Sequence, residues 1–482
     1  MVKLSMNAGD ALKVAKDNFE VVIEGESVKI FATIPLPNKI HEREMDKTDI
    51  PGPLRRSFSE ASTFNAGATL GPVNETNMAR IWNKHKQTNA PLKRKVFVGM
   101  SGGVDSSVAA ALLKEAKPNN FDKLFGRPTP KGFRGYEVHG VFMKNWADPR
   151  YPCPWQKDRQ DAMRVATILD IPFETWDFSK EYRDAVVSYM VREYALGRTP
   201  NPDVMCNREI KFGLFLQKAL ERGADFVATG HYVRMRRNLE LRNSNFEIDS
   251  KFKIQNSKFS SLLQASDSNK DQSYFLWTLN QKQLAHALFP IGDYTKPEVR
   301  ALAKKFGLPT AEKPDSQGIC FIGEIDVREF LRDELGTRRG KVLTTAGKVV
   351  GEHEGVQFYT IGQRHGLGFG GGVPFYVTEK NASANTLTVA EGPNDAELFS
   401  KTLEAYDANW ISGIPRFPLT CEARIRYRQP LQDCRVEVVG DRGQGLGNLV
   451  RVIFSEEQRA VTPGQSVVFY RKGVMLGGGI IA

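Results

Sequence analysis

The strongest chemical signal in the sequence is a loop rich in glycine and serine, between a predicted strand and a predicted helix. It reads Gly99-Met100-Ser101-Gly102-Gly103-Val104-Asp105-Ser106-Ser107. Glycine lets successive backbone N–H groups point inward, hydroxyls add donors, and a helix start adds positive potential, so such a loop suits phosphate groups. A tight packing turn is the alternative. Because Gly-Lys-Ser/Thr is absent, the loop is not a Walker A loop, and chemistry at an α-phosphate, with diphosphate leaving, fits it better.

Two of the five cysteines lie in polar segments that contain proline. Cys206 follows Asn201-Pro202-Asp203 and precedes a predicted helix, whose N-terminus would favour the thiolate. Cys320 lies in a second predicted loop, 313–323. Each could instead be a small buried apolar residue, and Cys153 is interpreted as structural. The odd number of cysteines and the absence of Cys-x-x-Cys argue against a disulfide scaffold and a structural zinc site.

Alternating strands and helices must position the loop and the cysteines. Strands are predicted at 95–100, 138–143, 173–176 and 226–228, and helices at 106–116, 158–169, 181–194 and 210–222. This alternation predicts an α/β fold, a doubly wound parallel sheet with right-handed crossovers. The polar segment 236–269 is predicted to be a mobile surface insertion in a hairpin. A further helix is predicted at 296–306, introduced by Thr295.

The rest of the chain has a different pattern. Beyond about residue 330, short alternating apolar runs separated by Gly, Asn and Pro predict a small β-rich linking domain and a C-terminal β-barrel. The expected domains are a poorly ordered N-terminal extension (1–92), a catalytic domain (93–325), a linking domain (326–400) and the barrel (401–482).

The composition limits the class of protein. The 482 residues are 41% hydrophobic, as in globular proteins, and no apolar run is long enough to span a bilayer. The formal net charge of +11 favours a polyanionic partner without identifying one. Residues 1–50 hold seven Lys or Arg against nine Asp or Glu, unlike a mitochondrial presequence, although Arg55-Arg56-Ser57 is closer to a processing signal.

Several motifs, taken together, resemble a known family. The glycine-rich loop resembles the PP-loop of adenylating ATPases, the adenine nucleotide alpha-hydrolase-like group that includes GMP synthetase. Later segments resemble the tRNA-specific 2-thiouridylase family, in that family's order: Asn201-Pro202-Asp203 with Cys206, Thr229–Tyr232, Lys270–Phe275, Asp315–Gly323, Thr360–Gly366, Arg426–Gln429 and Thr462–Gln465. The resemblance runs from about Val96 to Tyr470. The extension and the insertion depart from compact bacterial members and favour a eukaryotic one.

The resemblance implies an enzyme, a tRNA-uridine 2-sulfurtransferase. ATP, with Mg²⁺, would adenylate the C2 oxygen of the wobble uridine 34 in tRNA of the Lys, Glu or Gln type. Sulfur would replace that oxygen and give 2-thiouridine, AMP and diphosphate. A sulfur-donor protein, a cysteine desulfurase or a relay, would load Cys320 as a persulfide. Either Cys206 attacks that persulfide or the persulfide attacks the base directly, and both routes end in a Cys206–Cys320 disulfide.

The same resemblance implies roles for individual residues. The nucleotide would contact Gly99, Met100, Ser101, Gly102, Gly103, Val104, Asp105, Ser106, Met143 and Gly230. The target base would contact Asn201, Pro202 and Asp203, with Asp203 as general base or base-orienting group. The tRNA would contact His231, Lys270, Asp271, Gln272, Arg426, Tyr427 and Gln465. On the residues alone, Met143 could be a core methionine and Asp203 a helix cap.

One further pattern bears on RNA binding. Arg424, Arg426 and Arg428 alternate along a predicted strand, which would place three cations on one face, suited to a phosphate backbone. A solvated strand face is the alternative.

Two other functions are compatible with the loop. An adenylating ligase would need an ammonia source, and no glutaminase domain is evident. A tRNA-binding protein without catalysis would not need Asp105, Cys206 and Cys320. A mitochondrial location is expected from the eukaryotic members, with the cytoplasm as alternative. No membrane insertion and no metal-ligand cluster are expected, and the oligomeric state stays open.

Overall fold

The computed structural model describes residues 19–24, 27–32, 93–121, 129, 133–151, 153, 155–237, 259–315, 327–367, 372–439 and 449–482. The chain forms two compact units, residues 1–86 and 87–482. In the first unit, β1 (Phe19–Glu24) and β2 (Ser27–Ala32) pair as an antiparallel hairpin that the sequence analysis did not predict. The rest of the predicted N-terminal extension and Cys320 lie outside the described residues.

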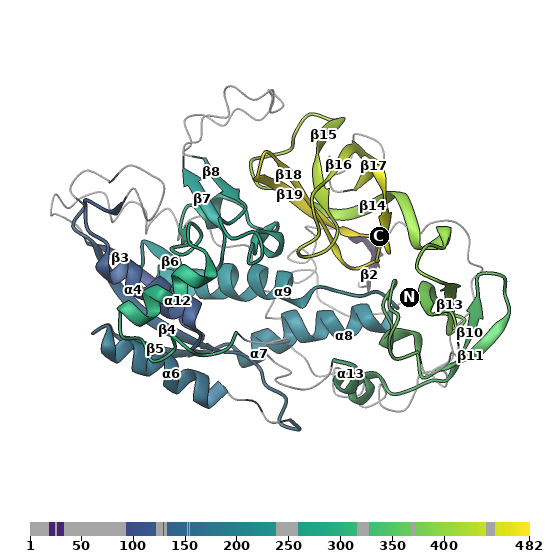
Figure 1. Cartoon of the computed structure of the whole chain (residues 1–482), viewed down its shortest axis with the longest axis horizontal. Helices are drawn as coiled ribbons and strands as arrows, with labels where there is room; N and C mark the ends of the chain where they lie inside the picture. The colour runs from purple at the N-terminus through teal and green to yellow at the C-terminus, as the bar shows by residue number, and fades with distance from the viewer. Residues whose placement is uncertain are drawn as a thin grey trace. The chain divides into compact units, whose positions relative to one another are not determined.

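The second unit begins with the predicted parallel sheet (Figure 1). Its order is β5-β4-β3-β6-β9, made of β3 (Arg94–Gly99), β4 (Tyr136–Lys144), β5 (Phe173–Asp177), β6 (Phe226–Ala228) and β9 (Ala287–Leu288). All neighbouring strands are parallel, which confirms the α/β prediction. After β3, the chain forms β4 and β5 on one side of it, and then β6 and β9 on the other side. The carboxyl end of β3 is therefore the switch point at which α/β proteins bind ligands.

Helices pack on this sheet through apolar faces. α4 (Val104–Glu115), α6 (Trp155–Ile168) and α12 (Lys296–Lys305) confirm three predicted helices. Fully buried residues of these helices join the β3 side chains in one core, which contains Val96, Val98, Val108, Leu113, Val165 and Val299. This core fixes the position of the loop between β3 and α4.

Two longer helical runs contain π-turns. The first consists of α7 (Ser179–Tyr182), η2 (Arg183–Val187) and α8 (Ser188–Ala195), and the second of α9 (Pro202–Met205), η3 (Cys206–Leu214) and α10 (Phe215–Glu221). The second run begins at Pro202 because the Asn201 side chain caps it and proline suits the first turn. The prediction that Cys206 precedes a helix is wrong, since Cys206 lies inside this run.

The C-terminal domain is a closed antiparallel barrel of six strands, as predicted. The strands are β14 (Phe399–Trp410), β15 (Leu419–Arg424), β16 (Gln432–Val438), β17 (Val450–Arg459), β18 (Ser466–Arg471) and β19 (Val474–Ile481). Pairing of β14 with both β17 and β19 closes the barrel. Its own core includes Val436, Val450, Val452 and Phe469.

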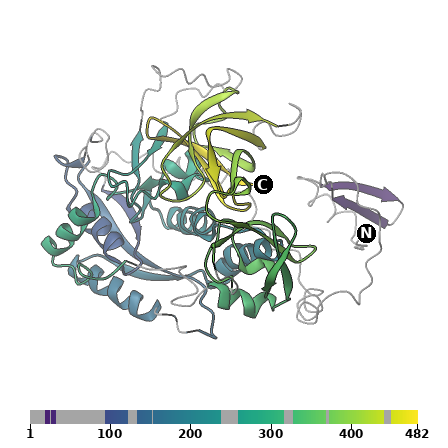
Figure 2. The same cartoon turned by 45° about the vertical axis from the view of Figure 1, so that its right-hand side comes forward.

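A hairpin from the catalytic domain extends the barrel sheet. β7 (Arg234–Arg237) pairs with β8 (Ser260–Leu263), and β8 pairs with β19, so the hairpin lies beside β18 and β19 (Figures 1 and 2). The hairpin prediction is confirmed, and residues 260–263 of the predicted insertion form its second strand. Ser260 to Leu262 are buried because this strand packs between β7 and the barrel.

The linking domain holds a four-stranded sheet in the order β11-β10-β13-β12. Its strands are β10 (Gly340–Thr344), β11 (Val349–His353), β12 (Phe375–Asn381) and β13 (Thr386–Glu391), preceded by α13 (Val327–Leu335). The shorter elements are η5 (Ser273–Leu276), α11 (Gln281–Leu284), η6 (Val356–Phe358) and η7 (Ala396–Leu398). None of the described helices has both the length and the apolar character needed to cross a bilayer.

Candidate functional site

The glycine-rich loop lies at the carboxyl end of β3, as expected. Gly102 has φ +76°, and a Cβ there would lie 2.2 Å from the Asp158 carbonyl oxygen, so only glycine fits. The Ser106 hydroxyl lies 3.1 Å from the Ser101 backbone nitrogen and 3.2 Å from the Ser101 hydroxyl. α4 starts after Gly103, which offers no side-chain acceptor to the first N–H groups of the helix. Those N–H groups and the exposed Ser101 hydroxyl can bind an anion.

The other residues assigned to the nucleotide contribute in different ways. Gly230 follows β6, and a Cβ there would lie 2.6 Å from the Ser106 nitrogen, so the chain passes directly against the start of α4. The Met143 side chain packs against Gly99. Met100 and Val104 are buried in the core, so only their backbone groups are available to a ligand.

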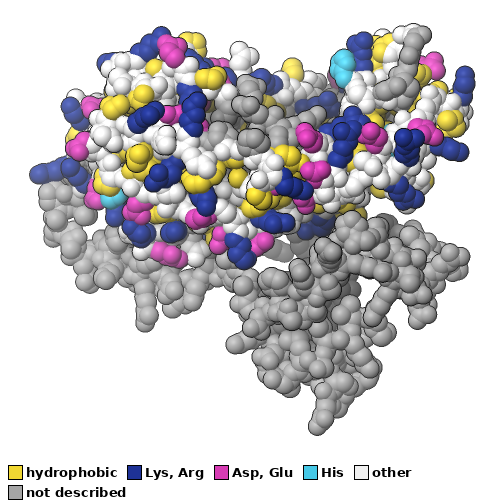
Figure 3. Space-filling model, turned by 90° about the horizontal axis from the view of Figure 1, so that it is seen from below, with side chains coloured by type: hydrophobic (Ala, Val, Ile, Leu, Met, Phe, Trp, Pro, Cys, Tyr) yellow, Lys and Arg dark blue, Asp and Glu magenta, His cyan; other side chains and the backbone are white. Residues whose placement is uncertain are grey.

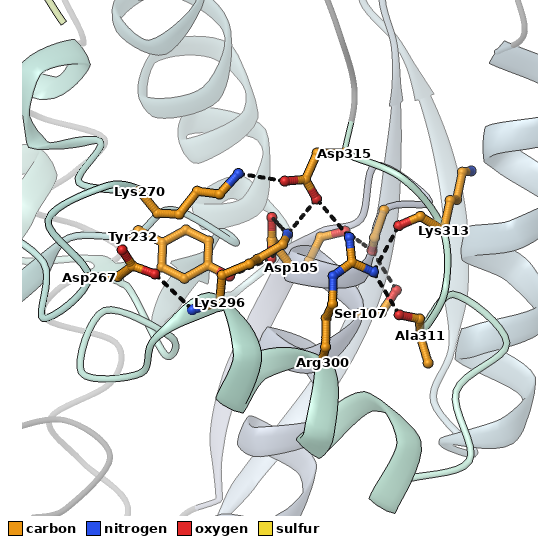
Figure 4. Close-up of polar contacts among 12 residues, drawn as sticks. Asp105, Ser107, Tyr232, Asp267, Lys270, Lys296, Arg300, Ala311, Lys313 and Asp315 are labelled. Carbon is orange, nitrogen blue, oxygen red and sulfur yellow. Dashed lines mark hydrogen bonds and ion pairs between the residues drawn. The ribbon is translucent and has the colours of Figure 1, made fainter. Parts of the chain in front are cut away.

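A lysine that the sequence analysis did not single out reaches this loop (Figure 4). The Lys296 ammonium lies 2.9 Å from Asp105 Oδ1 and 2.6 Å from Asp315 Oδ1. Tyr232 donates a 2.7 Å hydrogen bond to Asp105, and burial, reinforced by that carboxylate, raises the pKa of Tyr232. Lys296 opens α12, where Thr295 and Glu298 form a capping box. The helix start was readable from the sequence, but the contact with the loop was not, because it joins distant segments.

Asp315 connects this lysine to two more cations. Lys270 lies 2.5 Å and Arg300 3.2 Å from its carboxylate. Burial opposes the ionisation of Asp315, but hydrogen bonds from Lys270 and Lys296 outweigh it and lower the pKa to about 2. Lys313 similarly pairs with Asp158 and Asp161 beside the loop. Four cations therefore lie around the loop, where phosphate oxygens could replace some of their four carboxylate partners.

The helical run of Cys206 forms the second part of the site. Asn201 caps the run, so the alternative of Asp203 as the cap is wrong. Asp203 presents exposed surface to solvent, although many protein atoms lie around its carboxyl. This desolvation raises the pKa of its carboxyl, and the nearby Lys211 opposes the rise. Cys206, one turn further along, is 5% exposed.

His231 joins the two parts of the site from the segment after β6. It is 7% exposed, its Nδ1 lies 2.7 Å from the Thr229 hydroxyl, and its Nε2 lies 3.5 Å from Lys211 Nζ. Burial, and then the Lys211 charge, lower its pKa well below the usual value. The imidazole is therefore neutral, and its predicted contact with tRNA would be made without charge.

The Lys270-Asp271-Gln272 motif faces inward in this structure. Lys270 pairs with Asp315, and Gln272 accepts a 3.0 Å hydrogen bond from the Tyr232 backbone. Asp271 is 2% exposed and accepts bonds from the backbone of Ala265 and Ser273. These bonds, and the Arg424 guanidinium 3.5 Å away, give Asp271 a structural role between this motif and the barrel.

The predicted row of arginines on one strand face is wrong. β15 ends at Arg424, which is buried, lies 3.5 Å from Asp271, and stacks on Tyr470. Arg426 donates to the backbone carbonyls of Ile361 and Ala460. Arg428 has φ +64° in the turn that follows. The alternation fails because the strand is shorter than the sequence pattern indicated.

Two further barrel residues lie against the catalytic domain. Gln465 Nε2 donates to the carbonyls of Thr199 and Pro200, at 2.8 and 3.2 Å, just before the helix of Cys206. The Tyr427 ring lies 4.7 Å from that of Phe275 in η5. On the face shown in Figure 3, Lys and Arg side chains are spread among acidic and apolar ones instead of forming one patch.

Three other cysteines are described. Cys421 and Cys434 are paired across β15 and β16 with their sulfur atoms 3.7 Å apart, both buried. Cys153 is half-buried. No set of three or more His, Cys, Asp or Glu among the described residues is arranged to hold a metal ion.

Comparison with known proteins matches nearly all of the second unit. Family models match as tRNA methyl transferase HUP domain (residues 94–125 and 132–324), tRNA methyl transferase PRC-barrel domain (328–391) and Aminomethyltransferase beta-barrel domain (400–481). The tRNA-specific 2-thiouridylase MnmA 2 of Geobacillus kaustophilus is 46% identical over 396 residues, 81% of this chain and 95% of its own. The tRNA-specific 2-thiouridylase MnmA of Paraburkholderia phytofirmans is 47% identical over 398 residues, 81% and 94% of the two chains. The solved U34-tRNA thiolase NcsA from Methanococcus maripaludis is 17% identical and covers 54% of this chain and 73% of that one, with a TM-score of 0.28 too low to carry an argument.

Proposed function

The chain belongs to the tRNA-specific 2-thiouridylase family, and from this premise we propose that it replaces the C2 oxygen of a tRNA uridine with sulfur. One observation supports this most directly: the segment Thr229–Tyr232 contacts both parts of the site. Gly230 and Tyr232 lie against the phosphate loop, while His231 lies against Lys211 on the helix of Cys206. A nucleotide on the loop and a base beside Cys206 would be neighbours, as adenylyl transfer requires.

The first step activates a poor leaving group. The uridine O2 attacks the α-phosphorus of ATP, the bond to diphosphate breaks, and an O2-adenylated base forms. The loop N–H groups and Lys296 would bind the phosphates, whose charge must be stabilised while diphosphate leaves. Asp105 and Ser101 carry the oxygen ligands that Mg²⁺ prefers, and the ion, when bound, would share the charge of the phosphates.

The second step transfers sulfur and consumes two thiols. A persulfide on Cys320 carries the sulfur. Cys206 attacks the Cys320 sulfur, releases hydrosulfide to attack C2, and AMP leaves with the former O2; alternatively the persulfide attacks C2 first. In both routes the transferred sulfur is reduced to the sulfide level and Cys206 and Cys320 are oxidised to a disulfide, which an external thiol must reduce. Asp203 would accept or orient a proton of the base.

The direct test combines the protein with ATP, Mg²⁺, sulfide and unmodified tRNA for Lys, Glu or Gln. Nucleosides from the digested tRNA are read by mass spectrometry, and diphosphate release is followed in parallel. We expect one oxygen to be exchanged for sulfur at the wobble uridine. With a persulfide donor, Cys206→Ser and Cys320→Ser should abolish thiolation while ATP still binds, and Cys153→Ser serves as the matched control.

Each other outcome points to a different function. Thiolation retained in either serine variant would overturn the two-cysteine scheme. Diphosphate release that needs tRNA but gives no thiolated base would place the defect in sulfur supply. Diphosphate release without tRNA would indicate a different adenylating ligase, and no release at all a tRNA-binding protein.

We further propose a mitochondrial location and a persulfide-carrying donor protein. The resemblance to eukaryotic family members and Arg55-Arg56-Ser57 support the location. Imaging of the full chain beside a version that starts near Pro51 tests it, and an exclusively cytosolic signal from both would refute it.

A further inference from the structure

The helix of Cys206 carries a lysine that neither the motifs nor the reaction scheme uses. Lys211 lies in η3, a π-helix in which Phe215 N–H bonds to the carbonyl of Ile210, five residues back. Such turns hold more residues than α-turns and occur often at functional sites. Asp203 and Lys211 are eight residues apart, which is two turns of a run with about four residues per turn. The π-turn therefore brings Lys211 toward the face that carries Asp203.

Lys211 also contacts His231. An ammonium group only donates hydrogen bonds, so the Nε2 atom of His231, 3.5 Å away, must be the acceptor. The ring proton is then on Nδ1 and is donated to the Thr229 hydroxyl at 2.7 Å. The rings of Phe212 and Phe289 flank the imidazole at 6.1 and 6.3 Å. Burial keeps the ring neutral, and the contact with Lys211 favours the tautomer that has the free Nε2 lone pair.

From this geometry we infer that Lys211 is a positioning residue of the thiolation reaction, which keeps Asp203 ionised and His231 a neutral acceptor while the base is bound. The inference rests on the proposed function. Burial raises the pKa of Asp203, and the protonated acid could neither accept a proton nor bind the base as an anion. The burial that raises the pKa of Asp203 is opposed by Lys211 alone among the charged groups that act on it in the described structure.

Other titratable groups lie around this run, and four of them form two ion pairs with each other. Besides Asp203, Lys211 and His231, the titratable groups within the run and on the elements packed against it are Lys180, Glu181, Tyr182, Arg183, Asp184, Cys206, Arg208, Glu209, Lys218, Glu221 and Tyr274. Lys180 pairs with Asp184 at 2.7 Å, and Arg208 pairs with Glu209 at 2.6 Å. Tyr274 donates to the Ser466 carbonyl at 2.9 Å. None of these ion pairs supplies a net charge that would replace Lys211.

The test is the pH profile of single-turnover thiolation with enzyme in excess, in wild type, Lys211→Met and Lys211→Arg. Loss of a nearby opposite charge raises a carboxyl pKa by about one unit or more, so the acid limb of Lys211→Met should move up by about one pH unit. At pH values below this limb, the thiolation rate of Lys211→Met should be about tenfold lower than that of wild type, and at high pH it should approach the wild-type rate. Lys211→Arg should keep the wild-type limb.

Lys218→Met is the matched control on the same run. Its ammonium lies over the Trp176 ring at 4.9 Å, so its loss also removes a packed cation, without an expected change in the limb. If Lys211→Met does not fold, as judged by its melting curve, Lys211→Gln takes its place.

The outcomes separate this inference from the proposed function. Wild type that forms no 2-thiouridine contradicts the function itself. Wild type that thiolates, with an acid limb unmoved in Lys211→Met and Lys211→Gln, overturns the role of Lys211 alone. A limb displaced equally in Lys211→Arg also overturns it, because the retained charge should have been sufficient.

Discussion

Replacement of Lys296 by methionine would remove one charge from the phosphate loop and keep most of the side-chain volume. The Lys296 side chain is 11% exposed and pairs with Asp105 and Asp315. Lys270 and Arg300 still pair with Asp315 in the variant, whereas Asp105 keeps only the hydrogen bond from Tyr232 among its described partners. We therefore expect the Asp105 side of the site to change most.

Two effects of this substitution can be estimated, one on the free energy of unfolding and one on the rate of diphosphate release. A hydrogen bond to a charged group contributes about 1.5–3 kcal/mol, and the two carboxylates are 32% and 28% exposed, which favours the lower end. Two such contacts at the lower end sum to about 3 kcal/mol, so the free energy of unfolding should fall by up to about 3 kcal/mol. A positioned charge on a transferring phosphoryl group contributes about 10²–10³ in rate, so diphosphate release should fall by that factor.

The assay is diphosphate release that depends on tRNA, at saturating ATP, together with urea unfolding of the free protein. Lys304→Met on the same helix is the control, because its ammonium pairs with Glu312 at 2.7 Å on an exposed surface. Lys296→Arg should retain most of the rate. A Lys296→Met variant within about threefold of wild type would refute the assignment of this lysine to the phosphates.

Three further predictions concern contacts between distant segments. Gly230→Ala should slow diphosphate release about a hundredfold, because its Cβ would lie 2.6 Å from the Ser106 nitrogen; an unchanged rate would show that the segment can move aside. Gln465→Ala should lower the unfolding free energy of the tRNA-free protein by about 1–2 kcal/mol, whereas a residue that only contacts RNA would leave it unchanged in urea titration. Burial lowers the pKa of Lys380 to about 8, so between about pH 8 and pH 10 the unfolded chain binds the extra proton and wild-type stability should rise with pH. In Lys380→Met this rise, at most about 3 kcal/mol, should disappear from urea midpoints measured across that window.

The parts of the site that could be predicted are those for which neighbouring residues in the sequence form a recognisable pattern. The loop from Gly99 to Ser107 lies between an apolar strand and an amphipathic helix, and both could be read from neighbouring residues. The sequence pattern predicts a loop at Pro202. In the structure, Pro202 lies in the first turn of the Cys206 helix, directly after the Asn201 cap. Proline is compatible with both structures, so only the cap geometry decides.

The missed residues depend on contacts between remote segments. Lys296 looked like an ordinary residue at a helix start, and its role arises because α12 packs on α4. Asp271 belongs to a motif that resembles an RNA contact, yet the fold buries it against Arg424 of the barrel. Neither spacing nor composition contains the three-dimensional proximity of these groups. Sequence reasoning therefore located the chemistry but not all of its supporting side chains.

The sheet shared by the hairpin and the barrel has a consequence for synthesis of the chain. β8 is made long before β19, the strand with which it pairs. Until β19 leaves the ribosome, the outer edge of β8 has unpaired backbone groups, the kind of edge that promotes association with other chains. Release of β19 covers that edge and closes the barrel at β14 in one event. A nascent chain stalled before Val474 would therefore carry an open edge on its catalytic domain, and molecular chaperones would be needed most at that stage.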